Sequence, residues 1–178
     1  MFDINQIYKI DNFLTEEELD TLQKYAQRYV WTFTGFSHDP NSRVFWKKDL
    51  MHDLGLCKPV EKIFRSKIEQ TFNIKVESQD LYMNGQAHGQ CGSLHTDITV
   101  ETDGDYLTIV FFPQPQWNPE WGGFTVVIDS AQNIHCIYPN PNSVVIFNSK
   151  LPHVGLEPTI HCNAQRISLA YKVKIIKE

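Results

Sequence analysis

Three residues in the second half of the chain have the types and the order needed to bind one catalytic metal ion. His95 and Asp97 are two positions apart, and His153 follows much later in the sequence. Two imidazoles and one carboxylate can occupy one face of an Fe(II) ion and leave the opposite face open. The carboxylate balances part of the metal charge, and three protein ligands leave room for a cosubstrate and O2. The pattern predicts an iron centre formed by His95, Asp97 and His153.

An arginine and a serine near the C-terminus could bind the cosubstrate of such a centre. A guanidinium meets a carboxylate with two parallel hydrogen bonds and keeps its charge. Arg166 could therefore hold the distal carboxylate of 2-oxoglutarate, whose 1-carboxylate and 2-keto oxygen can chelate iron. Ser168 lies two positions on, so in a strand its hydroxyl faces the same side as Arg166. Taken singly, each residue is better explained by a structural role, Arg166 by a salt bridge at the surface of an edge strand and Ser168 as a small strand residue. Their order after the metal ligands favours an oxygenase that uses 2-oxoglutarate.

The spacing of the metal ligands is typical of strands that line a barrel. Side chains two positions apart in a strand share a face, so His95 and Asp97 could both point inward. His153 comes just after the apolar run at residues 144–147, so a distant strand must bring it opposite the other two ligands.

Helices are predicted early in the chain and strands later. Thr15 and Glu18 form a capping box, and Leu19 and Leu22 follow at helical spacing, which predicts a helix over about 16–29. A second apolar stripe predicts a helix within 57–71, and the segment through 34–41 is expected to be a strand end and a loop. Short apolar runs between Pro, Gly and Asn predict strands at 76–83, 106–112, 124–128, 134–138, 143–147 and 167–176.

This order of elements predicts a mainly β fold with flanking helices. We expect a jelly roll, or double-sheet barrel, with N-terminal helices packed on one sheet. The chain has 178 residues, which favours one domain over 1–178. Its helical part would cover about 1–74 and its β core about 75–178.

Composition and charge exclude some classes of protein. The formal net charge of −5 argues against a nucleic-acid partner, which usually meets a basic face. No apolar run approaches the roughly 20 residues of a membrane span, so no membrane partner is expected. The first residues lack the pattern of a signal peptide, which favours a cytoplasmic location. The cysteines form no CxxC pair and are expected to be free thiols; they are Cys57, Cys91, Cys136 and Cys162.

The chain resembles the 2-oxoglutarate/Fe(II)-dependent dioxygenases, and within them the small microbial and phage-encoded prolyl 4-hydroxylase-like group. The matching segments are LYMNGQ (81–86), SLHTD (93–97), LTIVFF (107–112), WGGFT (121–125), VIF (145–147), PHVG (152–155) and RISL (166–169). The resemblance implies a double-stranded β-helix of the cupin type. It implies Fe(II), 2-oxoglutarate as cosubstrate and O2, with ascorbate as a further candidate cofactor. Tyr82 matches the tyrosine that lines the cosubstrate pocket, and Gly122 and Gly123 match a glycine turn before an inner strand.

The same resemblance implies a substrate and a reaction. A prolyl residue in a peptide or protein would be hydroxylated, at its 4-position, while 2-oxoglutarate is converted to succinate and CO2. Asp97 argues against the halogenases of this superfamily, which lack the carboxylate. Trp117 and Trp121 could stack on a proline-rich peptide, although packing is the commoner role of such residues. The loop at 98–105 could be a lid or a plain solvated hairpin.

Two stretches are longer than in many relatives and could reshape the mouth of the substrate site. They are residues 88–92 and 159–163. The remaining histidines are expected at the surface or around the site; they are His38, His52, His88, His135 and His161.

Three other functions stay open from the sequence alone. An oxygenase of the alkylation-repair type would act on nucleic acid, but such enzymes usually carry a second arginine six residues after the anchor, where this chain has Lys172. An oxygenase could instead hydroxylate a free amino acid or another small metabolite. The third possibility is a cupin-like module that binds a metal or a sugar without catalysis.

Overall fold

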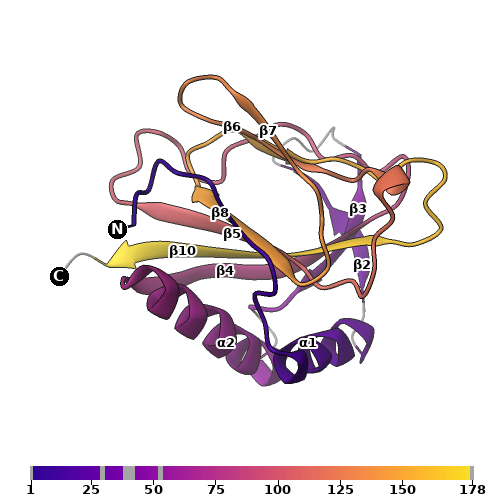
Figure 1. Cartoon of the computed structure of the whole chain (residues 1–178), viewed down its shortest axis with the longest axis horizontal. Coiled ribbons are helices and arrows are strands. Elements are labelled where there is room, and N and C mark those ends of the chain that lie inside the picture. The colour runs from indigo at the N-terminus through magenta and orange to yellow at the C-terminus, as the bar shows by residue number, and fades with distance from the viewer. Residues whose placement is uncertain (1, 29–30, 38–42, 52–53, 177–178) are drawn as a thin grey trace.

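A seven-stranded antiparallel sheet, the major sheet, forms the centre of the molecule (Figure 1). The structure is a computed structural model, and it describes residues 2–28, 31–37, 43–51 and 54–176. The strands of the major sheet, in spatial order, are β1 (Tyr8–Ile10), β8 (Ser143–Asn148), β5 (Tyr106–Phe112), β10 (Arg166–Ile176), β4 (Lys75–Gln86), β3 (Phe45–Asp49) and β2 (Thr32–Gly35). Strands β4 and β10 pair from Arg166 opposite Gln86 to Ile176 opposite Lys75.

A three-stranded minor sheet faces one side of the major sheet. Its order is β7 (Ile134–Ile137), β6 (Thr125–Ile128) and β9 (His153–Gly155), and the short 3-10 helix η1 (Pro119–Trp121) precedes β6. Figure 1 shows β6 and β7 above β5 and β8, on the side of the major sheet away from the helices. Apolar side chains of both sheets fill the space between them; they are Val110, Phe112, Val145 and Phe147 of the major sheet and Val127 and Ile137 of the minor sheet.

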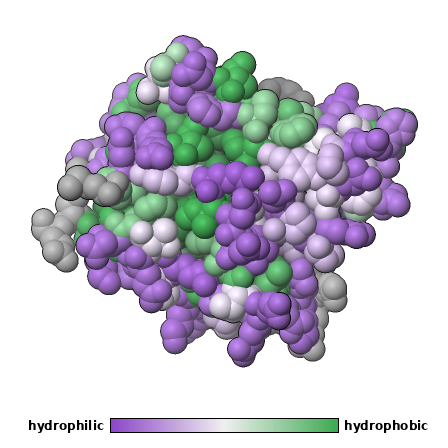
Figure 2. All heavy atoms as spheres, viewed as in Figure 1, coloured by the Kyte–Doolittle hydropathy of each residue, from purple (hydrophilic) through white to green (hydrophobic). Residues whose placement is uncertain are grey.

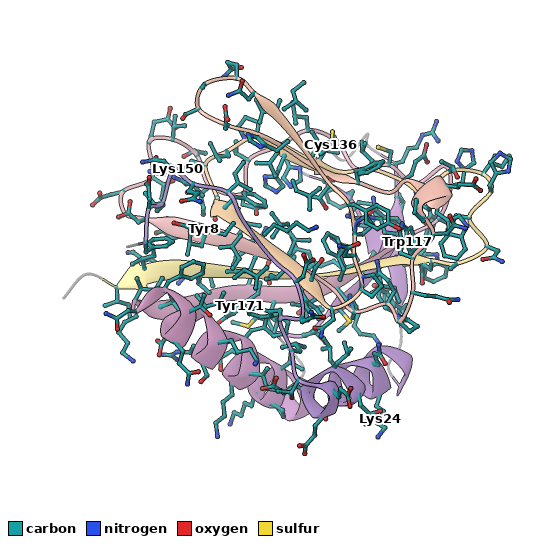
Figure 3. The ribbon with its side chains drawn as sticks, in the orientation of Figure 1. Tyr8, Lys24, Trp117, Cys136, Lys150 and Tyr171 are labelled. Atoms are coloured by element: carbon teal, nitrogen blue, oxygen red, sulfur yellow. The ribbon has the colours of Figure 1, made fainter. Side chains whose placement is uncertain are left out.

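Two helices cover the opposite face of the major sheet (Figure 1). Helix α1 (Glu16–Arg28) begins at the expected capping box, where the Thr15 amide donates to the Glu18 carboxylate at 2.8 Å. Helix α2 (Leu54–Phe72) packs along β4 and β10, and Figure 3 places Tyr171 between β10 and this helix. Figure 2 shows hydrophilic residues along the edge where the helices lie. Both helices therefore turn an apolar stripe to the sheet and a polar face outward.

Strand alternation gives β10 two different faces. Leu169, Tyr171 and Val173 belong to the core under the helices, and all three are fully buried. Arg166 and Ser168 point the other way, toward the minor sheet. Because successive side chains of a strand point to opposite faces, one strand serves the helix-packed core and the interior between the sheets.

The helices and the longer strands lie where the sequence predicts them. Strand β5 has the expected bounds, β4 and β10 extend beyond theirs, and α2 begins earlier, at Leu54. Strand β2, which ends at Gly35, agrees with the strand end expected within 34–41. The structure adds β1 and β3 to the part of the chain expected to be mainly helical, and it adds β9, where His153 begins a strand. The expected helix end at residue 29, the loop positions 38–41, His38 and His52 lie outside the described residues.

The expectations about membrane spans and cysteines can be compared with the described residues. No helix in the described part of the chain is long and apolar enough to cross a membrane. Cys91, Cys136 and Cys162 are free thiols.

Candidate active site

The structure brings the three predicted metal ligands together between the two sheets. One ligand atom each from His95, Asp97 and His153 lies within 4.8 Å of the others. The distance from Asp97 Oδ1 to His95 Nε2 is 3.6 Å, and that from Asp97 Oδ2 to His153 Nε2 is 3.5 Å. This grouping is compact enough for the three atoms to share one ion.

Backbone hydrogen bonds hold the two ligand segments beside each other. The His95 amide donates to the His153 carbonyl at 3.1 Å, and the His153 amide donates back at 2.8 Å. The Asp97 amide donates to the Ser149 carbonyl at 3.0 Å. These two bonds pair His95 with His153, the first residue of β9, in an isolated antiparallel bridge. Residues far apart in sequence are therefore fixed by the main chain rather than by the metal.

Both imidazoles are oriented by a carbonyl two residues earlier. His95 Nδ1 lies 2.8 Å from the Ser93 carbonyl oxygen, and His153 Nδ1 lies 2.9 Å from that of Leu151. A ring nitrogen facing a carbonyl carries the proton in the neutral imidazole, so Nε2 keeps its lone pair for a metal. Burial lowers the pKa of His153, which favours this neutral form.

Two neighbouring side chains hold the carboxylate of Asp97. Thr108 Oγ1 donates to its Oδ2 at 2.6 Å, and Lys172 Nζ lies 2.7 Å from its Oδ1. Burial alone would raise the pKa of Asp97, but its interactions with His95, His153 and Lys172 outweigh this effect and hold the pKa well below its usual range. The carboxylate is ionised and ready to bind a cation.

Arg166 is buried with hydrogen bonds to neutral oxygen atoms alone. Its Nε donates to the Gly123 carbonyl at 2.6 Å, Nη1 to Gln86 Oε1 at 2.8 Å and to Ser168 Oγ at 3.3 Å, and Nη2 to Thr125 Oγ1 at 2.7 Å. Burial lowers the pKa of Arg166 to about 10, so the group stays charged at neutral pH. No carboxylate of the described residues forms an ion pair with it. A buried cation without an anion is unfavourable unless a ligand supplies the charge.

Gly123 makes room for this arginine. Its φ is +70°, and a Cβ there would lie 3.1 Å from Arg166 Cδ and 3.2 Å from the Trp117 ring. The glycine turn of the sequence motif therefore has a physical reason, because a side chain would be strained and would press on the anchor.

A narrow cavity of about 60 Å³ extends from Arg166, the anchor, to His95, Asp97 and His153, the triad. Its lining includes Arg166, Ser168 and Tyr82 together with all three metal ligands. Burial raises the pKa of Tyr82 to about 12, so its hydroxyl keeps its proton. A second cavity of about 160 Å³ shares Tyr82 and the triad residues His95 and Asp97 and reaches Lys47 and Lys172. The two cavities form a path from the anchor, past the triad, to a mouth.

This arrangement fits a divalent metal and a small dicarboxylate. The donor set of two imidazoles and one carboxylate suits Fe(II). The buried guanidinium of Arg166 lines the same cavity and could bind a carboxylate. The residues expected to bind the cosubstrate, Arg166, Ser168 and Tyr82, all line the same cavity as the triad.

Several contributors were not expected from the sequence. Thr108, Thr125 and Gln86 hold Asp97 or Arg166, and Asn84 lines both cavities. Asn84 and Gln86 alternate with Tyr82 along β4, so the period of two is a signal that could have found them. Thr108 and Thr125 are ordinary strand residues whose role depends on which strands pair.

Other predicted features lie away from this path. None of residues 98–105 lines either cavity, and Lys150 Nζ binds the loop through the Thr102 carbonyl at 2.7 Å. Trp117 is buried, donates to the Gly122 carbonyl at 3.0 Å and packs edge-on against Trp121. Both tryptophans line a separate, mainly apolar cavity of about 300 Å³.

One of the two longer stretches reaches the site, and the remaining described histidines lie at or near the surface. Gly92 of the stretch 88–92 lines the narrow cavity, whereas none of 159–163 lines either site cavity. His88 and His161 are exposed, and His135 is partly exposed and lies 2.8 Å from Asp129.

Comparisons with known proteins agree with this geometry. A sequence profile of the 2OG-Fe(II) oxygenase superfamily matches residues 81–172. No curated protein matched by sequence.

Solved structures share the fold at low sequence identity. A prolyl hydroxylase from Trichoplax adhaerens, in complex with a peptide of hypoxia inducible factor, is 18% identical with a TM-score of 0.71, covering 97% of this chain and 84% of its own. A prolyl 4-hydroxylase from Pseudomonas putida is 17% identical with a TM-score of 0.68, covering 97% and 92%. HygX from Streptomyces hygroscopicus, with nickel, 2-oxoglutarate and hygromycin B bound, is 10% identical with a TM-score of 0.70, covering 97% and 84%. The fold is thus a double-stranded β-helix flanked by helices, which confirms the expected fold class.

Proposed function

The chain belongs to the 2OG-Fe(II) oxygenase superfamily, and we propose that it hydroxylates an unactivated C–H bond of a prolyl residue in a peptide or protein. Fe(II) and 2-oxoglutarate are the cofactor and cosubstrate of this family, and the His-Asp-His triad is present. One observation carries the oxygenase part of the proposal: the buried Arg166, which has no anionic partner among the described residues, lines the same narrow cavity as the three metal ligands.

Each predicted residue has a role in this proposal. His95, Asp97 and His153 hold Fe(II), Arg166 and Ser168 bind the distal carboxylate of 2-oxoglutarate, and Tyr82 forms a wall of the pocket. When bound, iron and 2-oxoglutarate would activate O2, which is the oxidant of the reaction: one of its oxygen atoms would enter the succinate formed as 2-oxoglutarate loses CO2, and the other would become the hydroxyl group of the substrate.

The chain itself supplies orientation and a dry interior. The hydrogen bond of Thr108 and the ion pair of Lys172 fix the plane of the Asp97 carboxylate. The apolar side chains of Val110, Phe112 and Phe147 fill the space behind the site and exclude water from it. A dry pocket strengthens the interaction of Arg166 with a carboxylate, because the effective dielectric constant there is low.

Sequence motifs and structural likeness support the prolyl substrate. The segments at 81–86, 93–97 and 166–169 resemble those of prolyl 4-hydroxylase-like enzymes. Two of the three solved structures named above are prolyl hydroxylases, one of them bound to a peptide.

A test of the cofactor assignment needs no substrate. Fe(II) and 2-oxoglutarate are added to the protein without oxygen, and the weak visible charge-transfer band of the chelated keto acid is recorded. We expect the band in the native protein and its loss in Asp97→Ala and Arg166→Ala. Ile160→Ser, at an exposed position remote from both cavities, is the control and should keep the band. A folded, iron-loaded protein without the band would favour a binding module that does not catalyse.

The prolyl substrate is tested separately. Proline-containing peptides are incubated with Fe(II), 2-oxoglutarate and oxygen, and a mass gain of one oxygen atom is sought. Modification of the prolyl residue supports the proposal. Failure of every peptide, in protein that shows the chelate band, contradicts the prolyl substrate and leaves the oxygenase assignment intact.

A further inference from the structure

We propose that the mouth of the active site binds a carboxylate group of the substrate, with Lys47 as the residue that contacts it and Lys172 as a second positive charge. The inference rests on the proposed function, because it names a chemical group that the substrate of the same site must carry. It adds a specificity-determining residue, Lys47, which lies outside every sequence motif described above.

Lys47 and Lys172 line one cavity from two different strands. They belong to β3 and β10, and the 160 Å³ cavity that they share also contains Tyr82, Asp80 and Asp97. Lys47 Nζ lies 4.5 Å from the centre of the Tyr82 ring, and Lys172 Nζ lies 5.2 Å from it. Both ammonium groups therefore border the entrance between solvent and the triad.

The ammonium of Lys47 has no anionic partner in the described structure. Its side chain is partly buried, and no carboxylate of the described residues forms an ion pair with it. A contact with an aromatic ring contributes about 0.5–1 kcal/mol at such a site, less than a close charge pair in a partly dry pocket. The position is therefore well suited to receive a negative group.

A count of charges points the same way. When a divalent metal and 2-oxoglutarate are bound, their charges together offset those of Asp97 and Arg166. The mouth then has Lys47 and Lys172 against one carboxylate, that of Asp80. One positive charge remains, and a substrate carboxylate would balance it.

Asn84 adds a second polar requirement. Its Oδ1 is buried and accepts no hydrogen bond, and the residue lies opposite Lys47 in the pairing of β3 with β4. 2-Oxoglutarate has no hydrogen-bond donor and cannot satisfy this oxygen. A substrate with an N–H near its carboxylate could, and amino acids and peptides both have this combination.

The test compares acids with their amides in two matched pairs. The first pair is L-proline and L-prolinamide; the second is the blocked peptide acetyl-Ala-Pro-Asp-amide and its Asn counterpart. Binding is measured by calorimetry to protein loaded with nickel(II) and 2-oxoglutarate, in which no turnover occurs. We expect the acid of one pair to bind at least about 10-fold more tightly than its amide, which is typical of one charged contact. The discriminating pair identifies the carboxylate as the α-carboxylate of a free amino acid or as an acidic side chain.

Lys47→Met removes the charge and keeps the apolar stem. It should lower the affinity for the favoured acid about 10-fold and abolish the preference over the amide. Lys174→Met is the matched control, because Lys174 is also partly buried and lies 5.7 Å from an aromatic ring, that of Tyr106, yet lines neither cavity. This control should bind both members of each pair as the native protein does.

The subsite is contradicted if acid and amide bind equally in both pairs, if no acid binds, or if Lys47→Met and Lys174→Met behave alike. Failure of the proposed function has a different signature, since 2-oxoglutarate itself would then fail to bind. In that case the comparison of native protein with Lys47→Met, both carrying nickel(II) alone, still tests the subsite, because Arg166 and the metal are the same in the two proteins.

Discussion

The two faces of the major sheet are built from the same strands, but one face packs against the helices and the other lines the candidate active site. The outer face, under the helices, is apolar: Phe64 of α2 packs against Phe111 and Tyr171, with ring centres 5.4 and 6.3 Å apart. The inner face of the same strands presents Arg166 and Thr108. On the outer face the large side chains of the described residues pack against one another, and on the inner face the charges of Arg166 and Lys47 have no anionic partner among the described residues.

The difference shows that the outer face stabilises the fold, whereas the inner face carries the groups that can bind ligands. Burying apolar surface stabilises the fold regardless of ligand. A buried guanidinium hydrogen-bonded to neutral oxygens, as at Arg166, is unfavourable until an anion arrives. Sequence rules for good packing are obeyed on the outer face and broken on the inner one, which is the usual mark of a functional site.

The largest expected effect is on the outer face. Phe64→Ala leaves a cavity among Phe13, Phe111 and Tyr171 and should lower the free energy of unfolding by about 3–5 kcal/mol. Urea denaturation measures this loss. The affinity for a divalent metal, measured on the folded fraction, should stay within about twofold of native. A large loss of metal affinity would show that the two faces are coupled.

Arg166→Met tests the inner face, where we expect a loss of ligand affinity and little loss of stability. Removing the anchor should weaken 2-oxoglutarate binding at least about 100-fold, equivalent to about 2.7 kcal/mol. The free energy of unfolding without ligand should fall by less than about 1 kcal/mol or rise, because an uncompensated buried charge is removed. Calorimetry and urea denaturation measure the two quantities. A strong loss of stability would mean that Arg166 holds the sheets together instead of awaiting an anion.

Thr108→Val removes the hydroxyl that orients Asp97 and keeps the shape of the side chain. Partners of metal ligands typically contribute about 10- to 100-fold in affinity, so metal binding should weaken by this factor. Thr108→Ser, which keeps the hydroxyl, is the control. Competition with a fluorescent chelator measures both, and equal affinities in the two variants would assign the ligand geometry to the main chain alone.

Ser168→Ala should have the smallest effect. Its hydroxyl lies 3.3 Å from Arg166 Nη1, and one hydrogen bond contributes about 0.5–1.5 kcal/mol. The expected loss of 2-oxoglutarate affinity is about 2- to 10-fold, again by calorimetry, with no change in metal affinity. A loss as large as that of Arg166→Met would make Ser168 a principal anchor.

The sequence predicts the long elements well and the short ones poorly. Strand β5 matches its expected bounds because its seven residues, all apolar or aromatic except Thr108, form one run between turn signals. Strands β1 and β9 have three residues each, too few for any periodicity to appear. Strand β3 includes Lys47 and Lys48, which resemble a polar loop until the pairing with β4 is known.

The sequence by itself determined which groups could do chemistry. Histidine, aspartate and arginine have distinctive reactivity, so the order of His95, Asp97, His153 and Arg166 was enough to predict iron and 2-oxoglutarate. Only the tertiary structure decided which ordinary residues serve them. Thr108 reaches Asp97, and Lys47 reaches the mouth, because strands far apart in sequence pair in one register. Such register depends on packing summed over the whole sheet, and no local pattern records it.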